Sequence, residues 1–339
     1  KVEGDYKILD NLAKITNGLY NSALYESTQR YKKEKKFYFY YDLCNILKDN
    51  MLYALLPSQT AQAVLQKVEG AIKSFIKLRR NNPNATYPRY HKKNTAWVIP
   101  FKSQQIKIDG NILIVPMSMK YKEEKGLSYL ELKIPNLRYN GIVKYIELYK
   151  TDKWYASIVI DVKEQQESVP NGNLYIDLGV KNLATVFDGK KVVIYSGGKV
   201  NSINRYRNKK NAEKQAILST IGKKTSKEKR RIAKKTLQQL KQQLHAMTKA
   251  IVQRAKAENK GIVIGDLSHI RDNAYYNNNA NQKIHQWQFA EITKQLFYKA
   301  KMLGVKITKV SEKDTSKTCA LCGQETNGRV HRGLYRCKL

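Results

Sequence analysis

Apolar residues recur at helical spacing through most of residues 6–85. Side chains three or four positions apart share one face of a helix, so this spacing predicts helices that bury a stripe. The first stripe is Leu9, Leu12, Ile15 and Leu19, and the second is Val64, Val68, Ala71, Ile72 and Phe75. Ser58, after a proline, is a suitable cap for the second helix. We therefore expect a helical N-terminal region.

The pattern changes from helical spacing to alternation after residue 86. The run IKIDGNILIV at 106–115 has an alternating stretch on each side of Asp109-Gly110, a pair that favours a tight hairpin turn. A second hairpin pattern covers residues 142–162. Short strands joined by tight turns predict a small β-barrel.

A mixed pattern of strands and helices begins at residue 173. The run LYIDLGVKNLATV opens a group of strands, and a strongly basic stretch follows it. A long helix then carries a stripe of Leu237, Leu240, Leu244, Met247 and Ile251 and ends before Gly261. The remaining predicted elements are a strand at 261–266, an Asn-rich loop, a helix at 285–304 and a strand at 305–312. This order predicts a mixed α/β sheet with helical insertions.

The charge of the chain is strongly one-sided. It has 63 Lys and Arg against 28 Asp and Glu, a formal net charge of +35. Such a field favours polyanions, and nucleic acid or an anionic membrane surface are the usual partners. No apolar run is long enough to span a bilayer and no signal-peptide pattern opens the chain, so we expect no membrane partner. The basic residues that we expect to contact nucleic acid are Arg89, Lys92, Lys93, Lys181, Arg205, Arg207, Arg230, Arg231, Arg271 and Lys317.

Two acids end apolar strand patterns. Asp177 lies in YIDLGVKN and Asp266 in IVIGDL, and Gly179 leaves room for a phosphate backbone. An ionised carboxylate in an apolar strand is costly unless it is paired or binds a metal. Acids from separate strands that meet at one edge of a sheet could hold two Mg²⁺ ions for phosphodiester hydrolysis. The alternative is that Asp177 ends its strand and caps a turn.

Three of the four cysteines lie near the C-terminus. Cys319 and Cys322 form a C-x-x-C pair followed by glycine, and Cys337 comes after fourteen further residues. This spacing predicts half of a zinc ribbon and a reducing compartment. We expect the fourth ligand just past Leu339, with His331 as a less suitable substitute on spacing. The alternative is free structural cysteines.

The motifs YPRYHKK, YIDLGVKNLAT, IVIGDLSHIRD and VSEKDTSKTCALCG occur in this order between residues 87 and 339. With them the chain resembles TnpB, the OrfB-type RNA-guided nuclease family of insertion sequences, a relative of type V CRISPR effectors. The resemblance implies a multi-domain α/β fold, although the family's opening strand is not evident at residues 1–5. Its implied parts are a helical recognition lobe (1–85), an OB-like wedge barrel (86–165) and a RuvC-like, ribonuclease-H-like nuclease domain (173–339) with a helical insertion at about 205–260 and a zinc ribbon from about 315.

The resemblance also implies a function. The protein would be an RNA-guided DNA endonuclease of the prokaryotic cytoplasm that binds a guide RNA and target double-stranded DNA, and it would need Mg²⁺ and Zn²⁺. Asp177 matches the first of three RuvC acids, and the third follows the zinc ribbon in the family.

The second acid departs from the family pattern. Gly265 stands where the common form has Glu, next to Asp266. Asp266 could turn inward, although strand alternation points it to the opposite face. Glu291, on the following helix, could instead reach the space beside Gly265, and we favour Glu291 as a catalytic residue and Mg²⁺ ligand. The missing glutamate leaves open a nuclease-dead, RNA-guided DNA-binding repressor, and the charge alone leaves open a non-catalytic accessory of transposition.

Overall fold

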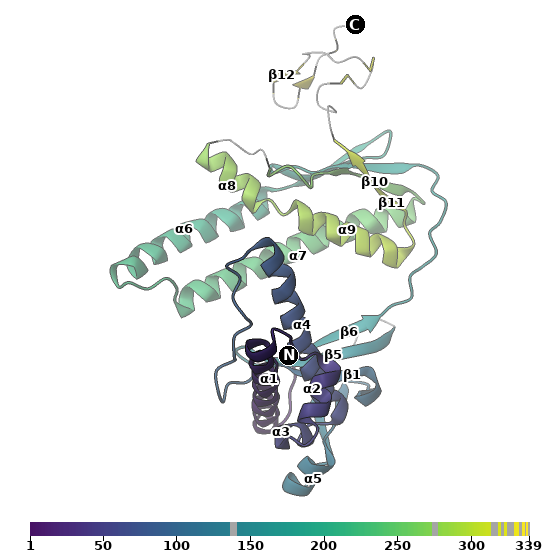
Figure 1. The fold of residues 1–339 in the computed structure, drawn as a ribbon. Coiled ribbons are helices and arrows are strands. Elements are labelled where there is room, and N and C mark those ends of the chain that lie inside the picture. The colour runs from purple at the N-terminus through teal and green to yellow at the C-terminus, as the bar shows by residue number, and fades with distance from the viewer. Residues whose placement is uncertain are drawn as a thin grey trace. The chain divides into compact units, whose positions relative to one another are not determined.

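The computed structural model describes residues 1–135, 141–272 and 277–312, together with short stretches at 318–319, 322–323, 329–331, 334–335 and residue 337. The chain forms two compact units, Lys1–Val162 and Lys163–Leu339 (Figure 1). Lys317 lies outside the described residues.

Four helices open the first unit, as the apolar spacing predicts. They are α1 (Tyr6–Glu34), α2 (Tyr40–Leu47), α3 (Met51–Ala54) and α4 (Ser58–Asn81). The Asp5 side chain caps α1 by accepting hydrogen bonds from the backbone N–H groups of Lys7 and Ile8. Both predicted stripes face the core, because Leu9, Leu19, Val64 and Val68 are buried.

The rest of the first unit contains two three-stranded antiparallel sheets, with the strand orders β1-β5-β6 and β2-β3-β4. The elements are β1 (Ile99–Lys102), the 3₁₀ turn η1 (Ser103–Gln105), β2 (Lys107–Asp109), β3 (Ile112–Pro116), α5 (Met119–Lys125), β4 (Tyr129–Lys133), β5 (Ile142–Lys150) and β6 (Trp154–Asp161). Both predicted hairpins are confirmed, and Gly110 takes the positive φ of 54° that the first turn needs.

Residues Val2 and Glu3 correct one expectation. They are extended and bond to both sheets: Val2 N–H donates to the Trp154 carbonyl, and Glu3 pairs with Lys133. An opening extended segment is therefore present, although it is too short to show as a sequence pattern. One hydrophobic core runs from Val2 through the helices to Trp154, so the helices and both sheets are packed as one body.

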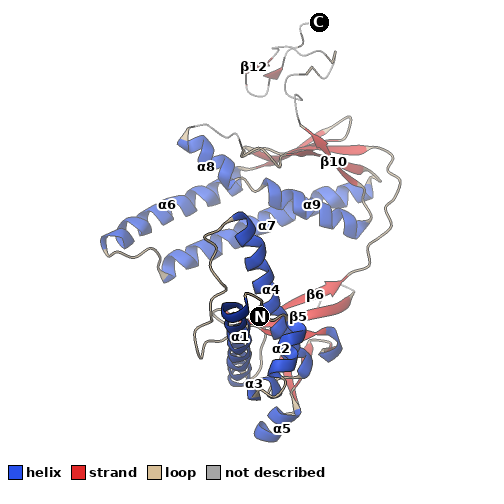
Figure 2. Ribbon diagram, viewed as in Figure 1, coloured by secondary structure: helices blue, strands red, loops and turns tan. Residues whose placement is uncertain are grey.

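The second unit is built on a five-stranded sheet with the order β11-β10-β7-β8-β9 (Figure 2). The strands are β7 (Asn173–Asp177), β8 (Asn182–Phe187), β9 (Val192–Ser196), β10 (Gly261–Asp266) and β11 (Ile307–Ser311). The first three form an antiparallel meander, and β10 is parallel to both β7 and β11. The short pair β12 (Arg329–His331) and β13 (Leu334–Tyr335) follows.

The helices of the second unit are α6 (Gly198–Thr220), α7 (Lys227–Ala257), α8 (Asn278–Gln286) and α9 (Phe289–Leu303). Residues of α7 and α9 bury one face of the sheet in a shared core (Figure 1). Within the predicted α7 stripe Leu237 is an error: it is 46% exposed, whereas the four later members are buried. The helix predicted at 285–304 is also interrupted at Trp287, and part of the expected Asn-rich loop is α8, capped by Asn277.

The predicted fold class is confirmed: a helical region, a small antiparallel β region and an α/β domain occur in that order. No helix among the described residues has the length and apolarity that a membrane crossing requires.

Candidate active site and zinc-ribbon cysteines

Three acids lie at one edge of the second unit's sheet. Asp177 is the last residue of β7, Asp266 is the last residue of β10, and Glu312 directly follows β11. These three strands are parallel neighbours, so their carboxyl ends lie at the same edge. That edge is where open α/β sheets most often bind ligands.

Gly265 explains how the third of these acids reaches the site. A Cβ added at Gly265 would overlap the carboxylate and the side-chain carbons of Glu312. The Glu312 side chain therefore lies directly over the backbone of Gly265. The register of β10 against β7 pairs Ile264 with Ile176, so one further step brings Gly265 beside Asp177.

This geometry offers a second candidate beside the predicted Glu291. The three atoms nearest to the Cβ position of Gly265 all belong to Glu312 from the adjacent strand end. Glu291 lies in the first turn of α9, where its carboxylate accepts a hydrogen bond of 2.9 Å from Gln295. Gln295 is 1% exposed and also accepts from the Thr248 hydroxyl on α7. Glu291 thus takes part in a polar network that joins two helices.

The electrostatics of the edge follow from its crowding. Burial raises the pKa of Glu312, and the negative charges of Asp177 and Asp266 raise it further. The pKa of Asp177 is raised as well, because neighbouring atoms desolvate its carboxyl even though part of the side chain reaches the surface. An acid whose pKa is raised by burial and by neighbouring acids, as that of Glu312 is, is typical of a functional site.

Asp266 differs from the other two acids. Hydrogen bonds from the hydroxyl and backbone N–H of Ser268, and the charge of Lys309 at 3.5 Å, lower its pKa. Its carboxylate is already held by partners in its own loop and on β11. It is nevertheless close enough to Glu312 to affect its titration.

Two further predictions concern the loops at this edge. The Cβ position of Gly179 faces its own turn, because an added Cβ would lie 2.8 Å from the backbone carbonyl of Asn182. The turn itself therefore requires glycine here, and approach of phosphate to this loop stays a prediction. Arg271 donates to the carbonyls of His285 and Trp287 and stacks on Phe289 at 4.9 Å, so it fastens the end of α8.

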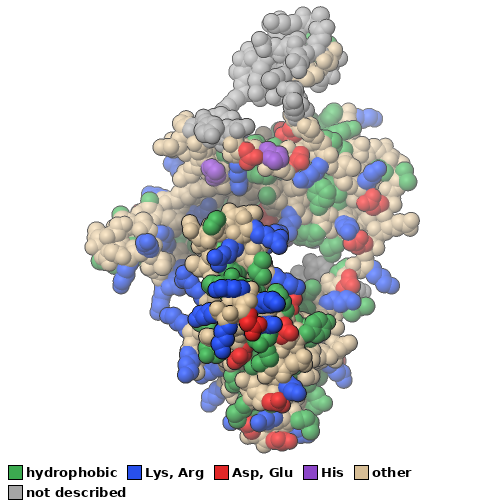
Figure 3. Space-filling view, in the orientation of Figure 1, with side chains coloured by type: hydrophobic (Ala, Val, Ile, Leu, Met, Phe, Trp, Pro, Cys, Tyr) green, Lys and Arg blue, Asp and Glu red, His purple; other side chains and the backbone are tan. Residues whose placement is uncertain are grey.

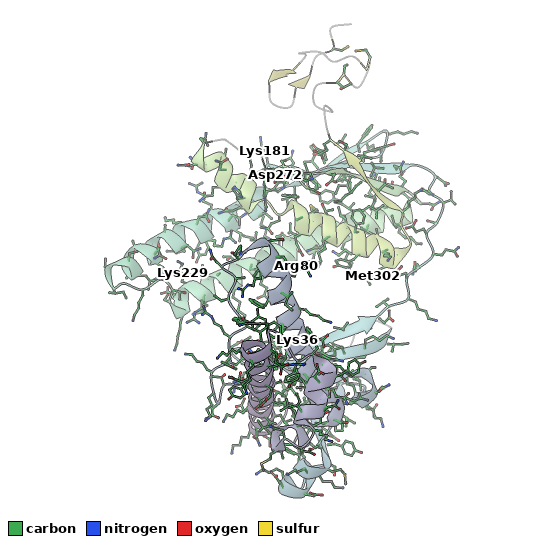
Figure 4. The ribbon with its side chains drawn as sticks, viewed as in Figure 1. Lys36, Arg80, Lys181, Lys229, Asp272 and Met302 are labelled. Atoms are coloured by element: carbon green, nitrogen blue, oxygen red, sulfur yellow. The ribbon has the colours of Figure 1, made fainter. Side chains whose placement is uncertain are left out.

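The other predicted basic residues are spread over the surface. Lys181 is exposed in the loop after β7, and Figure 4 labels it together with Asp272 of the loop after β10. Arg205 and Arg207 lie on α6, and Arg230 and Arg231 near the start of α7, close in sequence to the labelled Lys229. Arg89, Lys92 and Lys93 are exposed in the segment before β1 of the first unit.

The sulfur atoms of Cys319, Cys322 and Cys337 all lie within 4.8 Å of one another. The Sγ atoms of Cys322 and Cys337 are 3.7 Å apart. Tetrahedral zinc with Zn–S bonds of about 2.3 Å places two sulfurs about 3.8 Å apart, so the spacing fits Zn²⁺. The predicted cysteines do come together, while the side chain of His331 lies outside the described part.

Glu312 is the functional candidate that the sequence reasoning missed. The available signal was a repeated pattern, because YID, IVIGD and KVSE each end an apolar strand in an acid. Only the register between β10 and β11 shows that Glu312 lies over the backbone of Gly265.

Comparisons with known proteins extend this picture. Residues 157–271 match the family model OrfB_IS605, described as a probable transposase, and residues 289–339 match the Cas12f1-like TNB domain. The resemblance to the TnpB family is confirmed. The two matched segments contain Asp177, Asp266, Glu312 and the three clustered cysteines.

Two relatives and one solved structure give the extent of the likeness. The chain is 24% identical to InsQ of Escherichia coli strain K12, provisionally named an RNA-guided DNA endonuclease, over 84% of this chain and 70% of InsQ. It is 27% identical to the TnpB-like protein MJ0751 of Methanocaldococcus jannaschii over 48% of this chain and 60% of that protein. A cryo-EM structure of a Cas12f1–sgRNA–target DNA complex has the same fold, with a TM-score of 0.65 at 16% identity over 98% of this chain and 79% of that one.

Proposed function

We propose that this TnpB-like chain is an RNA-guided DNA endonuclease whose metal site uses Glu312 in place of a glutamate at position 265. The observation that carries the proposal is the Glu312 carboxylate lying over Gly265 at the edge that Asp177 and Asp266 share. The names of the relatives support the same activity. The Cas12f1 complex with sgRNA and target DNA, which shares the fold, supports guide RNA and target DNA as partners.

The acids at this edge fit Mg²⁺. All three donors are carboxylate oxygens, the ligands that this hard cation prefers, and a divalent ion would offset the repulsion that raises the pKa of Glu312. Asp177 and Glu312 are the proposed ligands, and Asp266 contributes negative charge beside them. Bound Mg²⁺ in such sites supplies Lewis-acid stabilisation of the phosphoryl group and an activated water.

The chain's own residues do the positioning. The parallel register of β7, β10 and β11 fixes the three acids on rigid strand ends. The absence of a side chain at residue 265 lets the Glu312 carboxylate approach the backbone of β10. Specificity in this proposal comes from base pairing between RNA and DNA, while the protein binds the sugar-phosphate backbones with its excess of Lys and Arg.

The nuclease-dead alternative rested on the missing glutamate at residue 265. Glu312 supplies a carboxylate at that place, which favours an active enzyme over the repressor. The transposition accessory rested on charge alone and accounts for neither the acids nor the cysteine cluster.

A cleavage assay tests the proposal. The protein, with the RNA that purifies with it, is incubated with matched and mismatched DNA in Mg²⁺ and in EDTA. We expect cutting of the matched DNA in Mg²⁺ alone. RNA-dependent binding without cutting would support the repressor, and binding that ignores RNA would support the accessory.

We also propose one Zn²⁺ held by Cys319, Cys322 and Cys337 and a fourth ligand outside the described residues. The contact distances between the sulfurs support this ligand set.

A further inference from the structure

The segment of residues 87–97 in the first unit is bonded to α1 at several points. Asn21 forms a two-way pair with His91: its side-chain amide donates to the His91 carbonyl at 3.0 Å, and its oxygen accepts from the His91 backbone N–H at 2.9 Å. Asn17, which is 1% exposed, donates to the carbonyls of Lys92 and Thr95 at 2.8 and 2.9 Å. These bonds turn the carbonyl groups of the segment toward the helix.

Aromatic rings hold the same segment from its beginning to its end. Tyr87 stacks on Phe75 of α4 with ring centroids 4.6 Å apart. The His91 ring lies 4.5 Å from that of Tyr20 and 5.0 Å from that of Trp97. Burial lowers the pKa of His91, so the imidazole is neutral at pH 7. Most of the aromatic groups of this segment therefore serve as anchors and are not free to stack on bases.

The exposed residues of the segment include three cations, Arg89, Lys92 and Lys93, and one free ring, that of Tyr90. The other exposed residues, Asn94, Thr95 and Ala96, are uncharged. No Asp or Glu occurs between Glu69 and Asp109, although that stretch contains many Lys and Arg. Figure 3 shows blue Lys and Arg side chains gathered over α4, and Figure 4 labels Lys36 and Arg80 at the nearby ends of α1 and α4.

The ends of these two helices meet the segment through ring contacts. Tyr31 of α1 stacks on Phe37, and Phe37 contacts both Phe75 and Tyr87. The exposed cations near the helix ends are Lys32, Lys33, Lys35, Lys36, Lys77, Arg79 and Arg80. The segment contains no acid, and Glu34 at the end of α1 is paired with Arg30 at 3.0 Å. The segment and the helix ends together therefore present an excess of cations, which suits a phosphate backbone.

We propose that residues 89–93 form a preformed binding surface for the RNA backbone and that Asn17 and Asn21 are its positioning residues. The inference rests on the proposed function and adds to it the place where RNA is held. RNA is the partner that fits best, because hydrogen bonds and ring contacts within the chain itself fix the segment in place. An RNA-guided protein holds its guide before it meets DNA, so a fixed surface suits the guide.

The positioning role of the two asparagines can be tested separately from the charge of the surface, because replacing them removes no cation. When they are lost, the cations stay on the chain but are no longer held in one arrangement, and binding must order them first. We expect the Asn17→Ala/Asn21→Ala variant to bind RNA about tenfold more weakly, which corresponds to about 1.4 kcal/mol.

The experiment uses the full chain without Mg²⁺ and RNA recovered from the wild-type preparation, with a DNA duplex of equal length as the second probe. Affinity is measured across a salt series. The matched control is Asn11→Ala, since Asn11 lies on the same helix but bonds to Tyr121. Arg89→Ala/Lys92→Ala/Lys93→Ala is the charge control, and each lost phosphate contact should lower the salt slope by about 0.7–0.9.

The proposal expects the asparagine variant to lose RNA affinity at every salt concentration with a salt slope close to that of wild type, because the same cations still reach the phosphates. Asn11→Ala should be unchanged, and duplex DNA binding should be unaffected in both variants. An unchanged RNA affinity, or an effect equal to that of Asn11→Ala, overturns it. A loss confined to the DNA probe overturns RNA as the partner. If the double variant does not fold, Asn21→Ala alone is measured by the same criteria. If the wild-type protein binds no RNA, the proposed function itself is contradicted. This measurement is made first, before any variant.

Discussion

Acids at the two ends of the second unit's sheet are held in opposite ways. Asp188 follows β8, which is antiparallel to β7, so it lies at the edge opposite Asp177. Its carboxylate accepts from the backbone N–H groups of Lys191 and Lys190 and pairs with Arg254 and Lys260, which lowers its pKa to about 2. At the other edge Asp177 and Glu312 have raised pKa values.

The contrast separates an acid whose ionisation stabilises the fold from acids whose ionisation is disfavoured, as the proposed metal site would require. Asp188 receives donors and opposite charges from its own chain, so ionisation favours folding. Glu312 is desolvated and lies near the negative charges of Asp177 and Asp266, so its ionisation opposes folding, and the proposed cation would offset that cost. Natural proteins commonly accept such a cost at functional sites.

The largest expected effect is on catalysis at Asp177. Asp177→Ala should lower the rate of DNA cleavage by roughly a thousandfold or more, because a metal ligand that stabilises the transition state is lost. RNA-guided DNA binding should remain close to wild type, since the strand end carries no contact that binding needs. Cleavage and binding are measured on the same preparation, and equal losses in both would contradict the assignment.

The second effect concerns zinc in the C-terminal cluster. Cys319→Ser/Cys322→Ser should lose the bound metal, because two of the three clustered thiolates are removed. Metal analysis of purified wild type and variant measures this, and Cys44→Ser is a control because Cys44 lies in α2 of the other unit. Zinc content that is the same in variant and wild type would rule out this ligand set.

The third effect is on stability, with opposite signs at the two edges. Asp188→Asn should lower the melting temperature by several degrees because two charge partners and two amides lose their anion. Glu312→Gln in metal-free protein should leave the melting temperature unchanged or raise it, because repulsion is removed. Thermal unfolding in EDTA tests both variants. A lower melting temperature for both would contradict the proposed difference between the acids at the two edges.

The fourth effect is the pH dependence of stability without metal. The pKa of Asp188 is lowered, so its stabilising contribution is complete above the unfolded value of about 4 and is lost as the pH falls toward 2. The pKa values of Asp177 and Glu312 are raised, so stability is lost as the pH rises from about 4 through their folded values.

Denaturant titrations in EDTA from about pH 3 to pH 8 measure the free energy of unfolding at each pH. The contribution of each edge should disappear in a different variant. Asp188→Asn should flatten the acid limb, and Asp177→Asn should flatten the decline above about pH 4. Addition of Mg²⁺ should restore stability at the alkaline end in wild type but not in Asp177→Asn. A wild-type stability that rises with pH above about pH 4 in EDTA would contradict the view that the raised pKa values of Asp177 and Glu312 dominate this range.

Much of the fold could be predicted from the sequence because period and turn chemistry are local signals. The hairpin at Asp109-Gly110 and the stripe of α7 from Leu240 onward are examples. Leu237 was wrongly predicted to be buried. The apolar spacing includes it, but the first part of α7 does not pack against the core that buries Leu240 and the later members. The break at Trp287 was missed because it depends on a tertiary contact, the Arg271 bonds to two carbonyls at the end of α8.

The site was predictable only in part for the same physical reason. Asp177 and Asp266 each end an apolar run, which is a local signal. The position of Glu312 over Gly265 depends on which strand lies beside β10 and in which register, and no local pattern encodes that. Glu291 was chosen by reach along the following helix, although its carboxylate is bonded to Gln295.

The central claim is that Glu312 supplies the second catalytic carboxylate, and parallel cleavage assays of Glu312→Gln and Glu291→Gln test it most directly. Both changes remove one charge and keep the side-chain length. With bound RNA, matched DNA and Mg²⁺, we predict that Glu312→Gln loses cleavage to the extent of Asp177→Ala, while Glu291→Gln keeps most of it. Full activity in Glu312→Gln together with loss in Glu291→Gln would contradict the account.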